Sequence, residues 1–129
     1  MISFQAFRQT DGTPIYLQII RYIQQGLAAG TLRDGDELPS RRVLSSLLAV
    51  NPNTVQKAFR LLEDEGLVTS RAGAKSYIQA APEQIAVLRR ELLETELQTM
   101  VDAARRMGLT REEAHRLLDT LYDKEGTDA

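Results

Sequence analysis

Apolar residues recur at helical spacing in the middle of the chain and predict two short helices joined by a tight turn within residues 38–66. The first helix is expected to begin after Ser40 and the second after Asn51, because Ser and Asn both cap helix N-termini. Pro52 suits a first helical turn, and Gly66 suits the position just after a helix end. The predicted apolar faces are Val43, Leu44, Leu47 and Leu48 in the first helix, and Val55, Ala58, Phe59 and Leu62 in the second.

The opposite side of the second helix carries amide, hydroxyl and cationic side chains. They are Asn53, Thr54, Gln56, Lys57 and Arg60. Such groups read base edges and hold phosphates, and a helix-turn-helix places its second helix in the major groove of DNA. The segment therefore predicts a DNA-reading helix-turn-helix, although by itself it leaves open a helix pair of an ordinary small helical domain.

A β-hairpin is predicted over residues 67–79, directly after the second helix. Apolar and polar residues alternate from Leu67 to Ser70, and a second β-type run begins at Tyr77. The small residues 72–74, Gly73 among them, form the turn between Arg71 and Lys75. A basic hairpin in this position is typical of the wing of a winged helix, where cations contact the DNA backbone or the minor groove. Ordinary solvated charge is the alternative for either cation taken alone.

A longer helix is predicted to precede this pair, opening at Thr13 and Pro14 and ending at Gly30. Its expected buried stripe is Tyr16, Ile20, Ile23 and Leu27. In a winged helix this element completes a three-helix core. The residues before it, with Ile2 and Phe4 among them, predict a short extended arm that packs on a neighbouring molecule.

Matches at fixed spacing between Pro14 and Ile78 make the chain resemble the GntR family of bacterial transcription regulators. The matching residues are Pro14 to Ile19, Gly30, Leu32, Gly35, Asp36, Leu38, Pro39, Ser40, Arg42, Leu44, Val50 to Val55, Leu62, Glu63, Gly66, Leu67, Val68, Gly73, Tyr77 and Ile78. The run from Asn51 to Thr54 and the short helical tail are similar to the YtrA subfamily. Many relatives carry Arg at the positions of Pro52 and Gln56, and Gly at the position of Lys75, so the operators of those relatives do not transfer to this chain.

The resemblance and the motifs together predict a sequence-specific DNA-binding regulator, which we expect to be a homodimeric repressor on a palindromic double-stranded DNA operator. The expected DNA-binding residues are Ser40, Arg41, Arg42, Asn51, Asn53, Thr54, Gln56, Lys57, Arg60, Arg71, Gly73 and Lys75. A winged-helix module that binds proteins and no longer reads DNA is the alternative function. A small-molecule effector is left open, because no convergent polar group in residues 81–129 identifies one.

The C-terminal part predicts a helical hairpin, separated from the winged domain at Ala80 to Pro82. A long helix over 83–107 ends at Gly108, and a capping box from Thr110 to Glu113 opens the last helix. The expected dimer contacts are Leu93, Leu97, Met100, Leu117 and Leu121, although the tail folding back on its own first helix is an alternative. The predicted fold is α+β and mostly α, with a winged helix-turn-helix domain at 1–80 and a two-helix dimerisation tail at 81–129.

Charge and composition limit the other functions. The net charge is −2, but residues 1–80 carry nine Lys and Arg against seven Asp and Glu, whereas residues 81–129 carry seven against eleven. DNA affinity must therefore depend on where the cations lie.

Cysteine is absent, His115 has no ligand partner at metal spacing, and no phosphate loop or catalytic arrangement occurs. We accordingly expect no enzyme, cofactor or metal site, and a cytoplasmic protein without membrane segments. The acidic run Glu63 to Glu65 is expected to be a solvated helix end.

Overall fold

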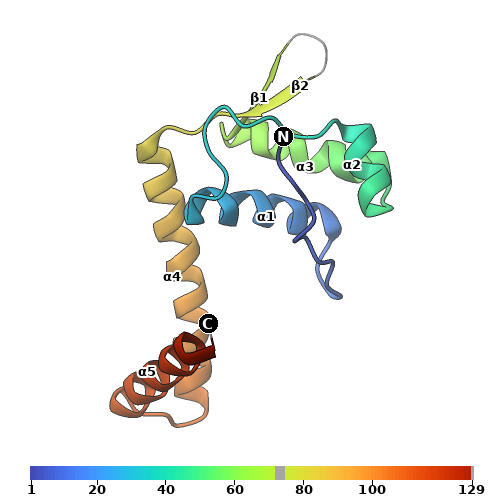
Figure 1. The fold of residues 1–129 in the computed structure, drawn as a ribbon. Helices are drawn as coiled ribbons and strands as arrows, with labels where there is room; N and C mark the ends of the chain where they lie inside the picture. Colours follow the sequence, from blue (N-terminus) through green and yellow to red (C-terminus); the bar gives the residue numbers. More distant parts are fainter. Residues whose placement is uncertain (72–74, 129) are drawn as a thin grey trace. The chain divides into compact units, whose positions relative to one another are not determined.

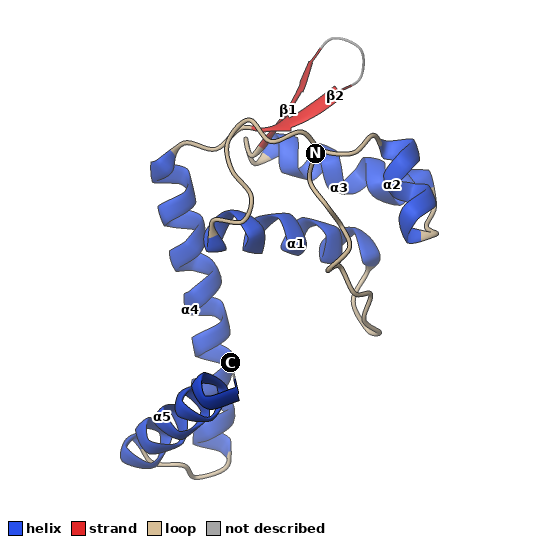
Figure 2. Cartoon of the chain, in the orientation of Figure 1, coloured by secondary structure: helices blue, strands red, loops and turns tan. Residues whose placement is uncertain are grey.

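The computed structural model describes residues 1–71 and 75–128, and these form five helices and one two-stranded hairpin (Figures 1 and 2). The elements are α1 (Ile15–Ala29), α2 (Arg41–Leu48), α3 (Pro52–Asp64), β1 (Val68–Arg71), β2 (Lys75–Ile78), α4 (Pro82–Arg106) and α5 (Arg111–Asp128). The predicted mostly helical α+β fold is confirmed. Backbone contacts divide the chain into Met1–Arg90 and Glu91–Ala129.

The caps expected from the sequence fix the ends of α2 and α3. The Ser40 hydroxyl accepts a hydrogen bond from the Val43 backbone N–H at 3.1 Å. The side-chain oxygen of Asn51 accepts from the Asn53 N–H at 2.8 Å. Each cap satisfies an N–H that has no partner inside its helix. At the other end of α3, Gly66 has φ of 78°, a backbone conformation that L-residues with a side chain rarely adopt.

The core of the first unit lies between α1, α2, α3 and the hairpin (Figure 1). Its largest fully buried side chains are Ile19, Ile23, Leu27, Leu38, Leu44, Val55, Phe59, Leu62 and Ile78. The predicted inner face of α3 is confirmed, since all four of its residues are buried. In α1 the predicted stripe was incomplete, because Ile19 is fully buried and Tyr16 is only half-buried.

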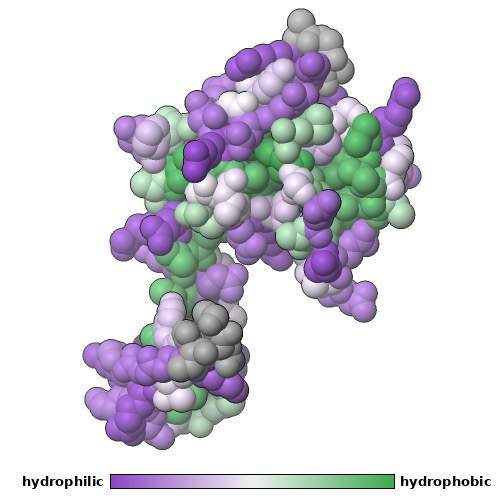
Figure 3. Space-filling model, in the orientation of Figure 1, coloured by the Kyte–Doolittle hydropathy of each residue, from purple (hydrophilic) through white to green (hydrophobic). Residues whose placement is uncertain are grey.

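The apolar stripe predicted for α2 is wrong at two of its four positions. Leu44 is buried and Leu48 is half-buried, but Val43 is 48% exposed and Leu47 is 68% exposed. Hydrophobic atoms are accordingly visible on the surface over α2 (Figure 3). A helix of eight residues has room for only one narrow line of contact, and here Ser45 is buried beside Leu44. Spacing alone does not show which residues of a wide apolar face will be covered.

The hairpin is held at its base by a third segment of backbone. The strands are antiparallel, with Val68 opposite Ile78 and Arg71 opposite Lys75. The Ile78 N–H donates to the Asp36 carbonyl at 2.8 Å, and the Leu38 N–H donates to the Ser76 carbonyl at 2.9 Å. The loop before α2 therefore fixes the hairpin with main-chain hydrogen bonds.

The N-terminal residues pack on their own domain, contrary to the expected contact with a neighbour. Ile2, Phe4 and Phe7 are buried in the core cluster of the first unit. The Phe4 ring stacks on Tyr22 of α1 with 4.8 Å between ring centroids. Pairing of aromatic rings adds to the gain from burial, which favours the intramolecular arrangement.

The second unit contains the capping box predicted between α4 and α5. The Thr110 N–H donates to the Glu113 carboxylate at 3.1 Å, and the Glu113 N–H donates to the Thr110 hydroxyl at 3.1 Å. Hydrogen bonds to the Glu113 carboxylate lower its pKa, with the bond from the Thr110 backbone N–H as the largest cause and the interaction with the Thr110 side chain next. The first turns of α4 belong to the other unit, where Ile85 and Leu88 pack against its core. The domain division at residue 80 remains a prediction.

Candidate nucleic-acid interface

The outer face of α3 presents the polar set that the sequence predicted. Asn53, Gln56, Lys57 and Arg60 are exposed and Thr54 is half-buried, while Val55, Ala58, Phe59 and Leu62 are buried on the opposite face. The helix is thus fixed by its apolar side, and its amides and cations remain accessible. This is the arrangement that a helix needs to enter a groove of DNA.

Two expected site residues, Ser40 and Asn51, already serve as caps at the N-termini of α2 and α3. Their oxygen atoms accept backbone N–H groups, but the Ser40 hydroxyl hydrogen and the Asn51 amide hydrogens remain donors. A helix N-terminus also attracts anions through its dipole and its free N–H groups. These positions can therefore hold phosphates while they define the helix starts.

Aromatic rings lie beside three of the cations, and the most distant is the Arg41 guanidinium, 5.8 Å from the centroid of the Phe59 ring. The Lys57 ammonium lies 4.1 Å from the centroid of the Tyr16 ring, which α1 supplies. The Arg71 guanidinium lies 4.4 Å from the centroid of the Tyr77 ring on the neighbouring strand. Cation–π contact restricts these long side chains without neutralising their charge. Sequence reasoning missed both supporting roles, although Tyr16 and Tyr77 are part of the motif that was recognised.

Cations flank the tip of the wing in register. Arg71 and Lys75 are directly opposite in the antiparallel pair, and both are exposed. Opposite residues of such a pair project from the same face of the hairpin. Gly73, the remaining expected wing residue, lies outside the described residues.

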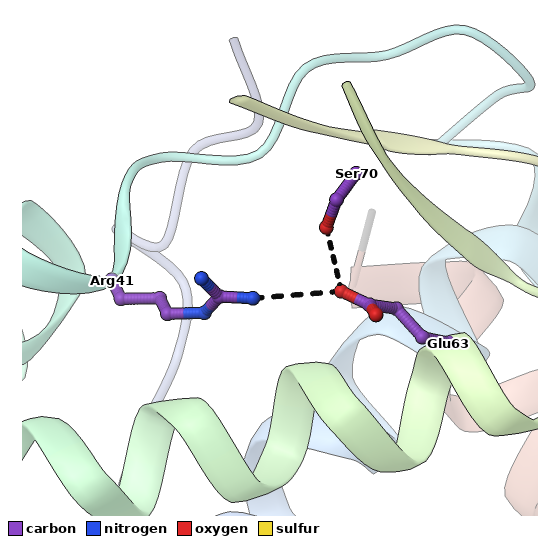
Figure 4. A network of polar contacts seen from close by, with 3 residues as sticks. All are labelled: Arg41, Glu63 and Ser70. Carbon is purple, nitrogen blue, oxygen red and sulfur yellow. Dashed lines mark hydrogen bonds and ion pairs between the residues drawn. The ribbon is translucent and has the colours of Figure 1, made fainter. Parts of the chain in front are cut away.

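Two neighbouring arginines at the start of α2 have different environments. Arg42 is exposed. Arg41 is half-buried and forms an ion pair with Glu63 of α3 at 3.5 Å (Figure 4). The Glu63 carboxylate also accepts a hydrogen bond from the Ser70 hydroxyl at 2.7 Å. Glu63 is therefore not the simply solvated residue that the acidic run suggested; only the tertiary fold brings its two partners together.

The five expected dimer residues are exposed in the single chain. Leu93, Leu97, Met100, Leu117 and Leu121 have exposed fractions of 49%, 51%, 45%, 51% and 51%. Figure 3 shows hydrophobic atoms on the surface of α4. Among residues 91–124 no residue is fully buried, although a few, Leu92 and Leu109 among them, are half-buried.

Two further observations concern metal ions and membranes in the part of the chain that the structure describes. No group of three or more His, Asp or Glu side chains there is placed to hold a metal ion, and His115 is exposed. None of the described helices is both long and apolar enough to cross a membrane.

A three-helix core, a capped and exposed α3 and a basic β-hairpin define a winged helix-turn-helix. The sequence profile described as "Bacterial regulatory proteins, gntR family" matches residues 15–78. The chain is 34% identical over 106 residues to the HTH-type transcriptional repressor YtrA of Bacillus subtilis (strain 168), covering 81% of this chain and 82% of that protein. The chain therefore belongs to the gntR family of bacterial regulatory proteins.

Solved structures agree with this assignment. A GntR family transcriptional regulator from Listeria monocytogenes superimposes with a TM-score of 0.79 at 28% identity, covering 87% of this chain and 98% of that one. YtrA from Sulfolobus acidocaldarius, a GntR-family transcription factor, superimposes with a TM-score of 0.56 at 32% identity, covering 78% of this chain and 99% of that one. These relatives are transcription regulators, and the chain has the winged DNA-binding fold of that class.

Proposed function

We propose that this chain is a homodimeric repressor that binds a palindromic operator through α3 and the wing. The observation that carries the proposal is the outer face of α3, where Asn53, Gln56 and Arg60 are exposed above a fully buried inner face. A module that binds only proteins would need an apolar or acidic surface there. The polar and cationic surface favours DNA.

Phosphate contacts are assigned to the ends of the elements that flank α3. Arg42 and Ser40 lie at the start of α2, and Arg71 and Lys75 lie on the wing. In a helix-turn-helix the first helix crosses the backbone while the second enters the groove. Asn53, Thr54 and Gln56 come from the first turns of α3, so we assign base contacts to them.

Dimerisation through the second unit is supported by its lack of a core. Residues 91–124 contain no fully buried residue, although their helices carry several large apolar residues. So short a unit cannot offset its loss of conformational entropy without burying apolar surface. A second copy would cover Leu93, Leu97 and Met100 of α4 and would supply the two-fold axis that an inverted repeat requires.

Selection of binding sites from random duplex DNA tests the function. The wild-type protein should enrich an inverted repeat whose half-sites lie about one or two turns of 10–10.5 base pairs apart. The DNA upstream of the protein's own gene should compete better than an unrelated duplex of the same length. Equal binding to all duplexes would contradict the proposal.

A further inference from the structure

Glu63 connects three elements of the interface through one carboxylate oxygen. Its Oε1 accepts a hydrogen bond from Ser70 on β1 at 2.7 Å and lies 3.5 Å from the guanidinium of Arg41 on α2 (Figure 4). Glu63 itself belongs to the C-terminal half of α3. The recognition helix, the wing and the start of α2 therefore meet at this side chain.

The two contacts differ in strength. The Ser70 bond has the short length of a charge-assisted O–H···O bond. The Arg41 contact is at the outer limit of a hydrogen bond, and the Arg41 Nε–H is buried without a partner among the described residues. Ser70 thus orients the carboxylate, whereas the charge of Arg41 is neutralised by a loosely bonded partner.

The position of Arg41 gives this pairing a consequence for DNA binding. Arg41 follows the Ser40 cap and precedes the exposed Arg42, at the end of α2 that we assign to phosphate contact. An unrestrained arginine there would gain a phosphate contact on any duplex, because phosphates carry no sequence information. Such a contact would strengthen binding to all sequences and would reduce the advantage of the operator.

We propose that Glu63 is a positioning residue that sets the specificity of this regulator. It keeps Arg41 from becoming a general phosphate contact, and through Ser70 it ties the wing to the recognition helix. The inference rests on the proposed function, because it concerns the ratio of operator binding to binding of unrelated DNA.

The Glu63→Gln variant tests the restraint on Arg41. Glutamine has the same shape and keeps an oxygen for Ser70, but it has no charge to pair with Arg41. Fluorescence anisotropy should show tighter binding to an unrelated duplex and a smaller ratio of operator to unrelated affinity. One added phosphate contact per chain steepens the salt dependence by a slope of about 0.9, or about 1.8 for the proposed dimer, which is roughly a 12-fold larger loss of affinity between about 50 and 200 mM salt.

Glu65→Gln is the matched control, because it removes the same charge two residues further along the chain. Glu65 accepts a hydrogen bond from Gln24 at 3.1 Å and does not contact Arg41 or Ser70 in the structure. It should leave the salt slope unchanged. An equal effect of Glu65→Gln would show that only the overall charge matters and would overturn the proposal.

Arg41→Met identifies the cation that is released. In the Arg41→Met background, Glu63→Gln should no longer alter the salt slope or the affinity for the unrelated duplex. A full effect in that background would refute the inference. So would a Glu63→Gln protein that equals the wild type in salt slope and in the ratio of operator to unrelated affinity.

Ser70→Ala, which leaves both charges in place, should lower the ratio of operator to unrelated affinity without steepening the salt slope. A wild-type protein that prefers no sequence would refute the proposed function itself, whereas a specific wild type with unaltered variants would refute only the role of Glu63.

Discussion

Individual polar residues of the interface divide into those that build it and those that remain accessible for contact. Ser40 and Asn51 cap helices, and Lys57 lies over the Tyr16 ring. Gln56 is exposed on α3, and its side chain makes no hydrogen bond with a described residue. A side chain without an internal partner can donate and accept at a base edge without first breaking a bond in the protein.

Replacing Gln56 with Ala should weaken operator binding by about 1–3 kcal/mol and relax the preference at one base position, because an amide reads a base through paired hydrogen bonds. Site selection with the variant measures both effects. Lys75→Ala is the contrast, since loss of a phosphate contact should weaken operator and unrelated DNA alike. An unchanged sequence preference for the Gln56 variant would exclude Gln56 as a reader.

One residue in the turn between α2 and α3 is under backbone strain. Ala49 has φ of 56° and is the one described non-glycine residue with positive φ. This conformation costs a residue with a side chain roughly 1–2 kcal/mol, while glycine adds about 0.4–1 kcal/mol of unfolded-state entropy. Ala49→Gly should therefore raise the free energy of unfolding by roughly 0.5–1 kcal/mol.

Urea unfolding of Ala49→Gly measures this gain. Ala86→Gly makes the same chemical change at an exposed helical position of α4, where glycine should cost roughly 1 kcal/mol. Opposite signs for the two variants are expected. Destabilisation by both would show that the left-handed conformation of Ala49 carries no strain.

At the scale of elements, helix ends followed local chemistry closely. The caps at Ser40 and Asn51, the glycine after α3 and the capping box at Thr110 all lie where residue type predicted them. Such signals work because each acts over three or four residues of chain. The exposed positions of α2 could not be predicted in this way, because they depend on which part of a short helix faces α3.

The capping box makes the start of α5 sensitive to acid. The Thr110 bonds hold the pKa of Glu113 below its ordinary value, so the ionised carboxylate stabilises the folded helix. This stabilisation is complete above the ordinary glutamate pKa of about 4.3 and is lost as the pH falls through the lower pKa of the folded state. NMR titration of Glu113 should show that lowered pKa.

Thr110→Ala should raise the Glu113 pKa part of the way toward its ordinary value, because the interaction with the Thr110 side chain is lost while the larger contribution, the bond from the backbone N–H of this residue, remains. Thr110→Ser keeps the hydroxyl and should preserve the lowered value. If the alanine and serine variants titrate alike, the Thr110 hydroxyl does not contribute to the lowered pKa of Glu113.

For the whole molecule, the two units differ in how they are stabilised. The first has an apolar core that includes Ile19, Phe59 and Leu62, all with zero exposure. Residues 91–124 of the second contain no fully buried residue. Apolar burial is the main driving force of folding, and the proposed dimer would supply the burial that these residues lack in the single chain.

Leu97→Asp should dissociate the dimer, because an unpaired carboxylate would lie in an apolar contact. The winged domain should remain folded, since Leu97 is outside its core cluster. Operator affinity should fall by about 10²- to 10⁴-fold as the second half-site loses its high effective concentration. Sedimentation and anisotropy measure the two effects.

Val87→Asp is the control for this change, because Val87 is a 57% exposed apolar residue of α4 outside the predicted dimer contacts. It should stay dimeric and bind the operator normally. A dimeric Leu97→Asp protein, or a monomer that binds the inverted repeat as tightly as the wild type, would contradict dimerisation through these residues.

The sequence by itself determined what is local: the helices, their caps, the inner face of α3 and the polar set opposite to it. These follow from spacing and residue type over short stretches of chain. Only the tertiary structure decided which apolar residues of α2 are covered, that the N-terminal segment packs on its own core, and that Glu63 meets Arg41 and Ser70. Those outcomes depend on contacts between residues distant in sequence, where packing geometry selects among faces and partners that the sequence pattern leaves equivalent.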